Sequence, residues 1–430
     1  MRQLSKARSL MQPRRWHDER ANGHEGADPL DPAARPGRAA VWIVLTALLA
    51  LGSAASFANL YPTAELQQAY AAETAGSPAV VALVGPVFAP TLGGLVAWRW
   101  TVQGLFLAGL ASLLTVIRHT RADEQAGRRE LLGSTVVGRH APLTAALAVT
   151  FAANLVMAAC AAAGLMALGL DASGSIALGL SVAAAAWTIT AVAAVAAQLA
   201  ESAGAARGIA LGVLVLCYLM RAVGDVGGAE GRLAWLSWLS PAGWARLTRP
   251  FAGEQWWVFA LFLAADVALI ALAYALSVRR DLGAGLLPPR LGSARAAARL
   301  RSPLALAWRL QRGLLLGWAA AFAVIGLAFG FVATTVADLL TVNPQLMDFF
   351  RDVGGTARPS DVVFDLYFLT FGPIIALYAI QATLRLQAEE LELRAEVVLA
   401  TLVSRLRWAA SHLVFAALGP AGVIAAPLAN

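Results

Sequence analysis

The chain has 430 residues, of which 59% are hydrophobic and only 14% are charged, and its formal net charge is +7 at pH 7. Soluble domains are usually about 45–50% apolar and about 25% charged, so this composition leaves too little polar surface for a water-soluble protein. Disorder is excluded by the same values, because disordered chains are poor in apolar residues. With only two cysteines, a disulfide scaffold is excluded as well. The remaining class is an all-α, polytopic helical membrane protein.

The N-terminal residues 1–38 are polar and basic and contain four prolines, which predicts a disordered tail in the cytoplasm. The apolar run 40–60 follows, and it has the length of about 20 residues that a helix needs to cross a bilayer. A cleaved signal peptide is the alternative, but this leader is long and its apolar core exceeds the usual ~7–15 residues. We expect a retained helix, with the N-terminus on the cytoplasmic side of the plasma membrane.

Eight further apolar runs predict about nine transmembrane helices in total. They are 101–117, 142–168, 176–198, 208–224, 257–278, 314–336, 362–384 and 409–428. The run 80–98 is also apolar, but it contains two prolines and three glycines, and counting it as a span would place the charged segment 118–130 outside. We interpret it as an external re-entrant or interfacial segment. In this topology 26 of the 33 Lys and Arg residues lie inside, as the positive-inside rule requires.

Two predicted cytoplasmic loops resemble each other. RADEQAGRRELLGSTVVGR (121–139) matches QAEELELRAEVVLATLVSR (387–405), and each follows the second helix of its section. Similar basic composition would explain matching arginines, but it does not explain acidic residues at matching positions. The pattern predicts two homologous helical bundles, one of six spans over residues 39–280 and one over residues 281–430 that is truncated after its third helix. The aligned pairs are Glu124 with Glu390, Arg128 with Arg394, Glu130 with Glu396, and Arg139 with Arg405.

A charged loop cannot lie in hydrocarbon, so it is either a solvated surface or a docking element for a soluble partner. Glu and Arg four residues apart, as in Glu124–Arg128, stabilise a short helix by a few tenths of a kcal/mol. Because the pattern occurs twice at equivalent topological positions, we favour docking. The candidate coupling residues are Arg118, Arg121, Glu124, Gly127, Arg128, Glu130, Arg139, Glu389, Glu390, Arg394, Glu396 and Arg405.

Three charged residues within or at the end of predicted spans are candidate intramembrane charges. Asp266 is near the middle of 257–278, where an ionisable group is a candidate for substrate or ion binding; a structural hydrogen bond is the alternative. Arg221 and Asp225 are four residues apart near an outer helix end, and we expect them to pair. The tryptophans of 235–257 are typical of an interfacial belt, with an aromatic drug site as the alternative.

Several longer motifs carry a family resemblance. They are RHTRADEQAGRRELL (118–132) with VGRHA (137–141), LMRAVGD (219–225), WLSPAGWARLTRPF (238–251), RRDLGAGLLPPRLG (279–292), SPLALAWRLQRGLLLGW (302–318) and the second loop. With these motifs the chain resembles ABC transporter permeases of the type-2 drug-export class, specifically the actinobacterial exporter of polyketide antibiotics permeases. The resemblance implies that the loop between the second and third helices is a coupling helix that contacts an ATPase, and that a re-entrant hairpin lies between the fifth and sixth helices. Family members usually have two complete six-helix halves, whereas this chain lacks the last three helices.

The sequence contains no motif of an ATP-hydrolysing domain and no other catalytic motif. Lys6 is the only lysine and has no glycine-rich turn of a P-loop beside it, so ATP would bind a separate, dimeric ABC ATPase subunit. We find no metal-ligand set and no nucleophile elbow, so we expect no enzyme, no bound cofactor and no metal. The arginines are scattered between apolar runs, which argues against nucleic-acid binding.

The leading hypothesis is therefore the permease subunit of an ATP-driven exporter of small hydrophobic drugs or polyketide-like antibiotics in the lipid bilayer. An ion-gradient-driven secondary transporter is one alternative, and it needs buried carboxylates, of which Asp266 is the main one. A membrane-embedded enzyme would need clustered His or carboxylates at one depth. A non-transporting assembly or sensory protein is the third alternative.

Overall fold

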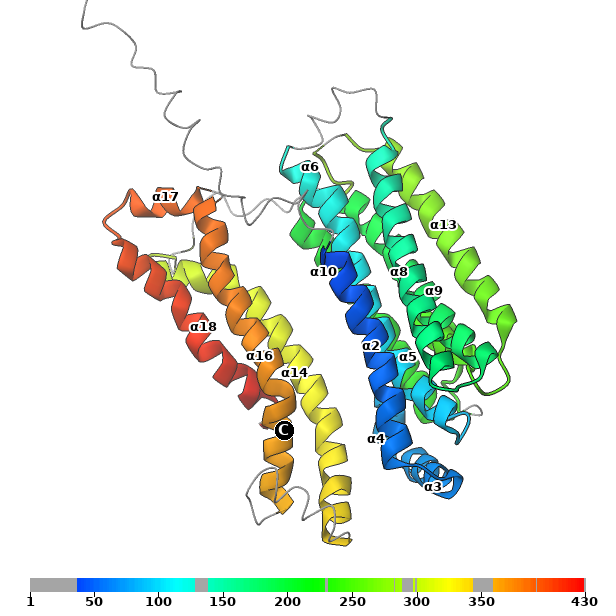
Figure 1. Ribbon diagram of the computed structural model, residues 1–430. Coiled ribbons are helices and arrows are strands. Elements are labelled where there is room, and N and C mark those ends of the chain that lie inside the picture. Colours follow the sequence, from blue (N-terminus) through cyan, green and yellow to red (C-terminus); the bar gives the residue numbers. More distant parts are fainter. Residues whose placement is uncertain are drawn as a thin grey trace, which may run out of the picture.

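The computed structural model describes residues 37–127, 138–228, 231–281, 283–287, 297, 300–342, 359–391 and 393–428. Within these ranges every regular element is a helix, as Figure 1 shows, and this confirms the all-α prediction. Six of the described helices are long and apolar enough to cross a membrane, and they correspond to the first six predicted spans. Their bounds are Ala40–Leu60, Leu92–Gln125, Ala141–Ala167, Ala172–Leu199, Ala203–Val226 and Trp256–Val278.

Helix α9 is the central helix of this group. Its most apolar stretch is 78% buried, more than in any of the other five spans, and it packs against α5, α8, α10 and α13. Alanine and glycine allow this close approach, since a Cβ on Gly179 would lie 2.6 Å from the backbone oxygen of Ala158 on α8. The long helices are α2 (Gly37–Leu60), α5 (Leu92–Ile117), α8 (Ala141–Ala167), α9 (Ala172–Leu199), α10 (Ala203–Val226) and α13 (Phe259–Val278).

The second span begins earlier than predicted. Helix α5 starts at Leu92, where the Thr91 hydroxyl accepts the backbone N–H of Gly94 at 3.2 Å and caps the helix. Residues 92–98 therefore belong to the span, and the re-entrant interpretation of 80–98 was wrong for them. Gly93 does not break the helix; it gives room to Phe251, whose ring carbon would lie 2.6 Å from a Cβ there.

Short elements fill both ends of the group. Residues before α5 form α3 (Ala64–Ala75) and α4 (Pro78–Val84), and residues 118–125 continue α5 as η2 (Arg118–Ala122, a π-helical turn) and α6 (Asp123–Gln125). Between α10 and α13 the chain forms α11 (Trp235–Trp238), α12 (Pro241–Leu247) and η3 (Trp256–Val258), where the resemblance implies a hairpin.

The remaining helices lie beside the first group in Figure 1. They are α14 (Pro303–Val342), α16 (Pro359–Leu391), α17 (Arg394–Leu399) and α18 (Arg405–Leu428). Helix α14 packs on α16 and α18 and also contacts α4. These helices cover the last three predicted spans, but they are not among the six candidates, so the count of nine and the two-copy layout over 39–280 and 281–430 stay predictions. The predicted tail lies outside the described residues except for 37 and 38, where α2 begins.

Candidate functional site

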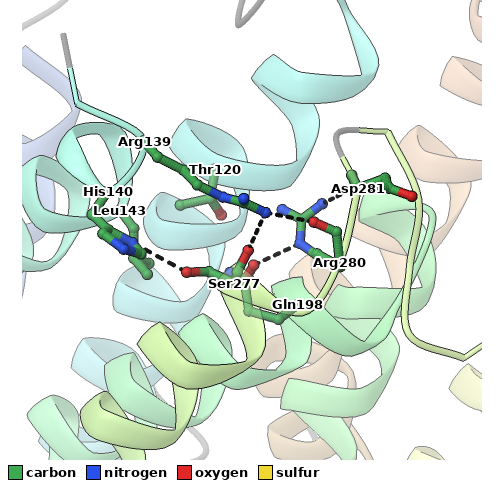
Figure 2. Close-up of a pocket in the computed structure, with 8 residues that line it drawn as sticks. All are labelled: Thr120, Arg139, His140, Leu143, Gln198, Ser277, Arg280 and Asp281. Carbon is green, nitrogen blue, oxygen red and sulfur yellow. Dashed lines mark hydrogen bonds between the residues drawn. The ribbon is translucent and has the colours of Figure 1, made fainter.

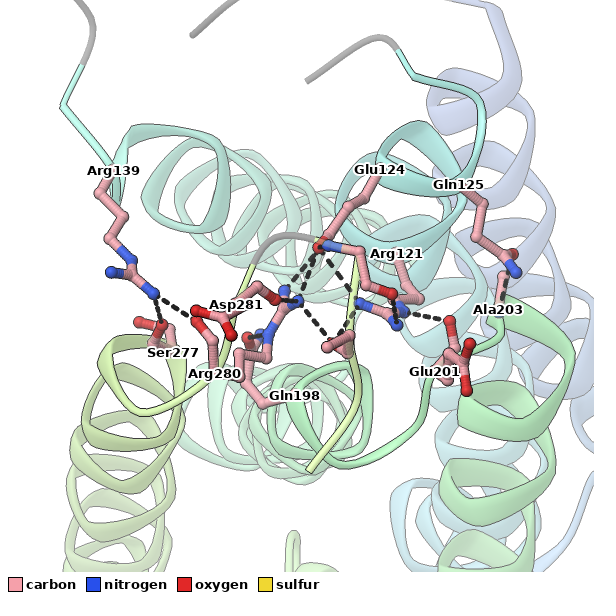
Figure 3. Close-up of polar contacts among 12 residues, drawn as sticks. Arg121, Glu124, Gln125, Arg139, Gln198, Glu201, Ala203, Ser277, Arg280 and Asp281 are labelled. Atoms are coloured by element: carbon pink, nitrogen blue, oxygen red, sulfur yellow. Dashed lines mark hydrogen bonds and ion pairs between the residues drawn. The ribbon is translucent and has the colours of Figure 1, made fainter. Parts of the chain in front are cut away.

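A buried ion pair lies where the loop after α5 meets the end of α13. Glu124 accepts both terminal nitrogens of Arg280: Nη1 lies 2.6 Å from Oε1 and Nη2 lies 2.7 Å from Oε2 (Figure 3). The backbone N–H of Gly283 donates to Oε1 at 2.7 Å, and Arg280 Nε donates to the Gln198 side chain on α9 at 2.7 Å. Bidentate pairing of this kind fixes both the position and the orientation of the Glu124 and Arg280 side chains.

Arg121 completes this arrangement from the other side. Its Nη1 lies 3.2 Å from Glu124 Oε1, and the side chain is fully buried. The guanidinium also donates to three backbone oxygens: Glu201 at 2.6 Å, Ala284 at 3.0 Å and Gly283 at 3.0 Å. We call Arg121, Glu124, Gln198 and Arg280 the Glu124 cluster.

The loop also caps the next helix of the group. The side chain of Gln125 accepts the backbone N–H of Ala203, the first residue of α10, at 2.9 Å (Figure 3). The segment 118–127 is thereby joined to α9, α10 and α13 at once. It contains a π-helical turn, a feature often found at functional sites.

A small cavity lies beside the cluster. Arg139 donates from Nη2 to the backbone oxygens of Ser277 at 2.7 Å and Arg280 at 2.6 Å, and so satisfies carbonyls at the end of α13 (Figure 2). The Ser277 hydroxyl lies 3.2 Å from His140 Nδ1. The cavity is lined by Thr120, Arg139, His140, Leu143, Gln198, Ser277, Arg280 and Asp281.

The structure thus brings three predicted coupling residues close to the end of α13: Arg121, Glu124 and Arg139. Arg118 is half-buried at the end of α5, and Gly127 closes α6 with a φ of +71°. The predicted residues Arg128 and Glu130 lie outside the described residues.

In the second loop the buried carboxylate is Glu389. Its oxygens lie 2.9 Å from both Arg385 Nη2 and Arg394 Nε. The sequence alignment pairs Glu124 with Glu390 instead, but Glu390 is exposed. The other predicted residues, Glu396 on α17 and Arg405 at the start of α18, are exposed as well.

Arg221 and Asp225 form the predicted pair at the opposite end of α10, with Nη1 and Oδ2 3.2 Å apart and both side chains buried. Asp225 also accepts Arg246 Nη2 at 2.7 Å and the Ser237 hydroxyl at 2.8 Å, both from the segment that follows α10. Burial lowers the pKa of the Arg246 guanidinium to about 10, although Asp225 acts in the opposite direction. These four residues form the Asp225 cluster.

Asp266 is buried on α13, as its position in the span predicts, with 6% of the residue exposed. Its Oδ1 is buried and has no hydrogen-bond partner in the described part of the chain. A single unpartnered acceptor in a tightly packed helix interface is unusual, and it needs a functional or structural explanation.

The sequence did not indicate Arg280, Gln198 or Arg246 as site residues. A signal was present for Arg280, because it lies in the pair RR directly after an apolar run, where arginine meets the end of a helix. Gln198 and Arg246 carry no such signal, since only the fold brings them to Glu124 and Asp225.

Six apolar helices, of which the alanine-rich α9 is the most buried, with buried ion pairs at both ends of the group, define a multi-pass membrane protein. The comparisons define its family. The protein "Multidrug efflux system permease protein Rv1217c" of Mycobacterium tuberculosis H37Rv is 44% identical over 384 residues, which cover 89% of this chain and 69% of that protein. The family model "Multidrug efflux system permease Rv1217c, C-terminal domain" matches residues 300–429. The chain belongs to this family of drug-efflux permeases.

Proposed function

We propose that this chain is the membrane-spanning subunit of an ATP-driven exporter of the ABC type-2 class. A separate, dimeric ATPase would bind the ATP and would drive export of the substrate. The permease would lie in the plasma membrane with its N-terminus in the cytoplasm. The proposal is supported by the relative named as a multidrug efflux permease and by two charged loops, α6 and α17, at the same end of the molecule (Figure 1). Small hydrophobic molecules of the polyketide-antibiotic type are the proposed substrates.

The observation that carries the proposal is the contrast between the two loops. In the first, the Glu124 cluster and Gln125 tie residues 118–127 to α9, α10 and α13, so a displacement of the loop is passed to three helix ends. In the second, Glu390 at the end of α16 is exposed, as are Glu396 and Val397 on α17, which leaves an accessible surface of mixed charge and apolar area. Rigid attachment and an open surface are together what a mechanical coupling element needs.

The test of coupling is a double charge reversal, Glu390→Lys with Glu396→Lys. Both carboxylates are exposed, so the permease should still fold, while co-purification of the ATPase from native membranes in mild detergent should fall at least about tenfold. The same variant should lose the stimulation of ATP hydrolysis by the permease. The physical reason is charge repulsion: a partner surface that binds the two carboxylates is positively charged and would repel the new lysines.

Glu73→Lys is the matched control, because Glu73 is an exposed acidic residue on α3, away from both loops. It should bind the ATPase like the parent. Retained ATPase recovery and retained stimulation in the double variant would contradict the assignment of α17 as a coupling element.

A second candidate function, transport driven by a proton gradient, is favoured by one observation: the buried Oδ1 of Asp266 without a partner. If Asp266 carries the driving ion, Asp266→Asn should abolish drug export from cells and export should stop on addition of an uncoupler. If the chain is ATP-driven, ATP depletion should stop export, and Asp266→Asn should reduce it by no more than about the factor expected for one lost substrate contact, roughly tenfold. Efflux of a fluorescent drug under the two treatments separates the mechanisms.

A further inference from the structure

The Asp225 cluster holds more positive than negative charge. Arg221 and Arg246 share the single carboxylate of Asp225, and a third guanidinium, that of Arg249, has no ion pair among the described residues. Arg249 and Arg246 each lie 4.9 Å from the centre of the Phe88 ring. Neighbouring guanidinium groups repel one another, and one carboxylate does not neutralise three of them, so the site has an excess of positive charge that an anion would balance.

Two of these guanidinium groups also have unused hydrogen-bond donors. The Nε atoms of Arg221 and Arg246 are buried and have no partner among the described residues. Arg221 is 1% exposed, so water does not reach it freely. Leaving a charged donor buried without an acceptor is unfavourable, and each such donor in a native structure needs an explanation, of which a bound anion is one.

An apolar cavity opens beside the charges. Pro86, Phe88, Trp98 and Pro250 line it together with Arg246. Gly85 has a φ of +104°, and a Cβ at that position would lie 2.9 Å from Arg246 Cδ, so glycine is what allows the chain to pass so close to the arginines. The cavity lies where α4 is followed by α5 and beside α12, at the end of the spans and hence near the membrane–water boundary.

The backbone at Arg249 adds a further sign of specialisation. Arg249 has a φ of +50° and Phe251 a φ of +60°, a left-handed conformation that costs energy in any residue other than glycine. Strain of this kind persists where the surroundings fix it and is concentrated at ligand sites. Here it holds the guanidinium of Arg249 against Phe88.

We propose that this cavity binds the oxyanion head group of an amphipathic molecule, with its apolar body against Phe88 and Trp98. A carboxylate or phosphate would accept from Arg249 and from the free donor of Arg246. The source is either an anionic phospholipid at the membrane surface or an amphipathic anion on its way through the permease. The site is independent of the ATPase partner, and it is separate from the Glu124 cluster at the other end of α10.

The experiment measures binding to the purified full chain in a neutral detergent, using brominated lipids that quench tryptophan fluorescence. Brominated stearate and brominated phosphatidylglycerol are the two anionic probes, and brominated phosphatidylcholine is the probe without net charge. Saturable quenching by an anionic probe, with at least tenfold weaker quenching by phosphatidylcholine, is expected. Stearate alone would identify a free amphipathic anion as the ligand, phosphatidylglycerol alone would identify a lipid, and binding of both would show that the head-group charge is decisive.

Arg249→Asn removes the charge, and asparagine tolerates the left-handed backbone, so the chain should still fold. The variant should weaken anionic binding at least tenfold, whereas Arg249→Lys should retain most of it. Arg232→Asn, at an exposed arginine in the same connection between α10 and α13, is the matched control and should bind like the parent. Equal affinity of Arg249→Asn and the parent, or equal quenching by phosphatidylcholine, would overturn the proposal.

Discussion

Replacing Glu124 with alanine is expected to destabilise the chain by about 3–5 kcal/mol, the range measured when one partner of a buried ion pair is removed. The variant would leave the guanidinium groups of Arg121 and Arg280 buried without their carboxylate, and the backbone N–H of Gly283 without its acceptor. The expected result is a marked fall in the melting temperature of the purified protein. Thermal unfolding in detergent, monitored by circular dichroism, measures this fall. Expression should fall with it.

Glu390→Ala is the matched control for this result. Glu390 aligns with Glu124 in the sequence repeat but is exposed, so the same substitution should change stability by less than about 0.5 kcal/mol. Equal effects of the two variants would show that the Glu124 cluster contributes no more than an ordinary surface carboxylate.

A second large effect is expected for Gly179→Ala on α9. The new Cβ would lie 2.6 Å from the backbone oxygen of Ala158, and a backbone oxygen cannot move aside as a side chain can. Helices α8 and α9 would have to separate, which should cost about 1–3 kcal/mol, as overpacking usually does. Thermal unfolding in detergent measures it, and drug efflux from cells should fall in proportion to the loss of folded protein.

Gly212→Ala on α10 provides the control, since nothing lies within 4 Å of a Cβ there. The same chemical change in an open helical position should leave stability unchanged or raise it by up to about 1 kcal/mol, because alanine favours helix. Opposite signs for the two variants are the expected outcome. Destabilisation of both would mean that glycine flexibility, and not close packing, is what α9 requires.

The sequence was sufficient to predict the existence of six of the spans, because apolar runs of about 20 residues have few structural alternatives. It was less informative where small residues and prolines interrupt a run. The glycines and prolines of 80–98 favoured a re-entrant or interfacial segment, yet Gly93 lies inside α5 and gives room to Phe251. Composition alone does not reveal whether a glycine ends a helix or lets another residue approach it.

Local contacts of the site were also easier to predict than distant ones. Arg221 and Asp225 are neighbours on one helix face, and their pairing followed from a spacing of four residues. The partner of Glu124 is 156 residues further along the chain, and no spacing rule connects it with Arg280. In the second loop both Glu389 and Glu390 are candidate residues, and only the structure shows that Glu389 is the buried one, because a shift of one residue moves a side chain about 100° around a helix.

The segment that follows α13 remains hydrogen-bonded to the first group of helices beyond the end of α13. The backbone N–H of Leu286 donates to the carbonyl of Gln198 at 3.3 Å, and that of Leu287 donates to the carbonyl of Leu199 at 2.9 Å. These two bonds hold the segment at the C-terminal end of α9. The segment that follows α13 therefore stays attached to the helix group as far as Leu287, and the helix to which it is attached is the most buried of the six candidate spans. Any tilt of α9 would therefore displace this segment together with the end of the helix.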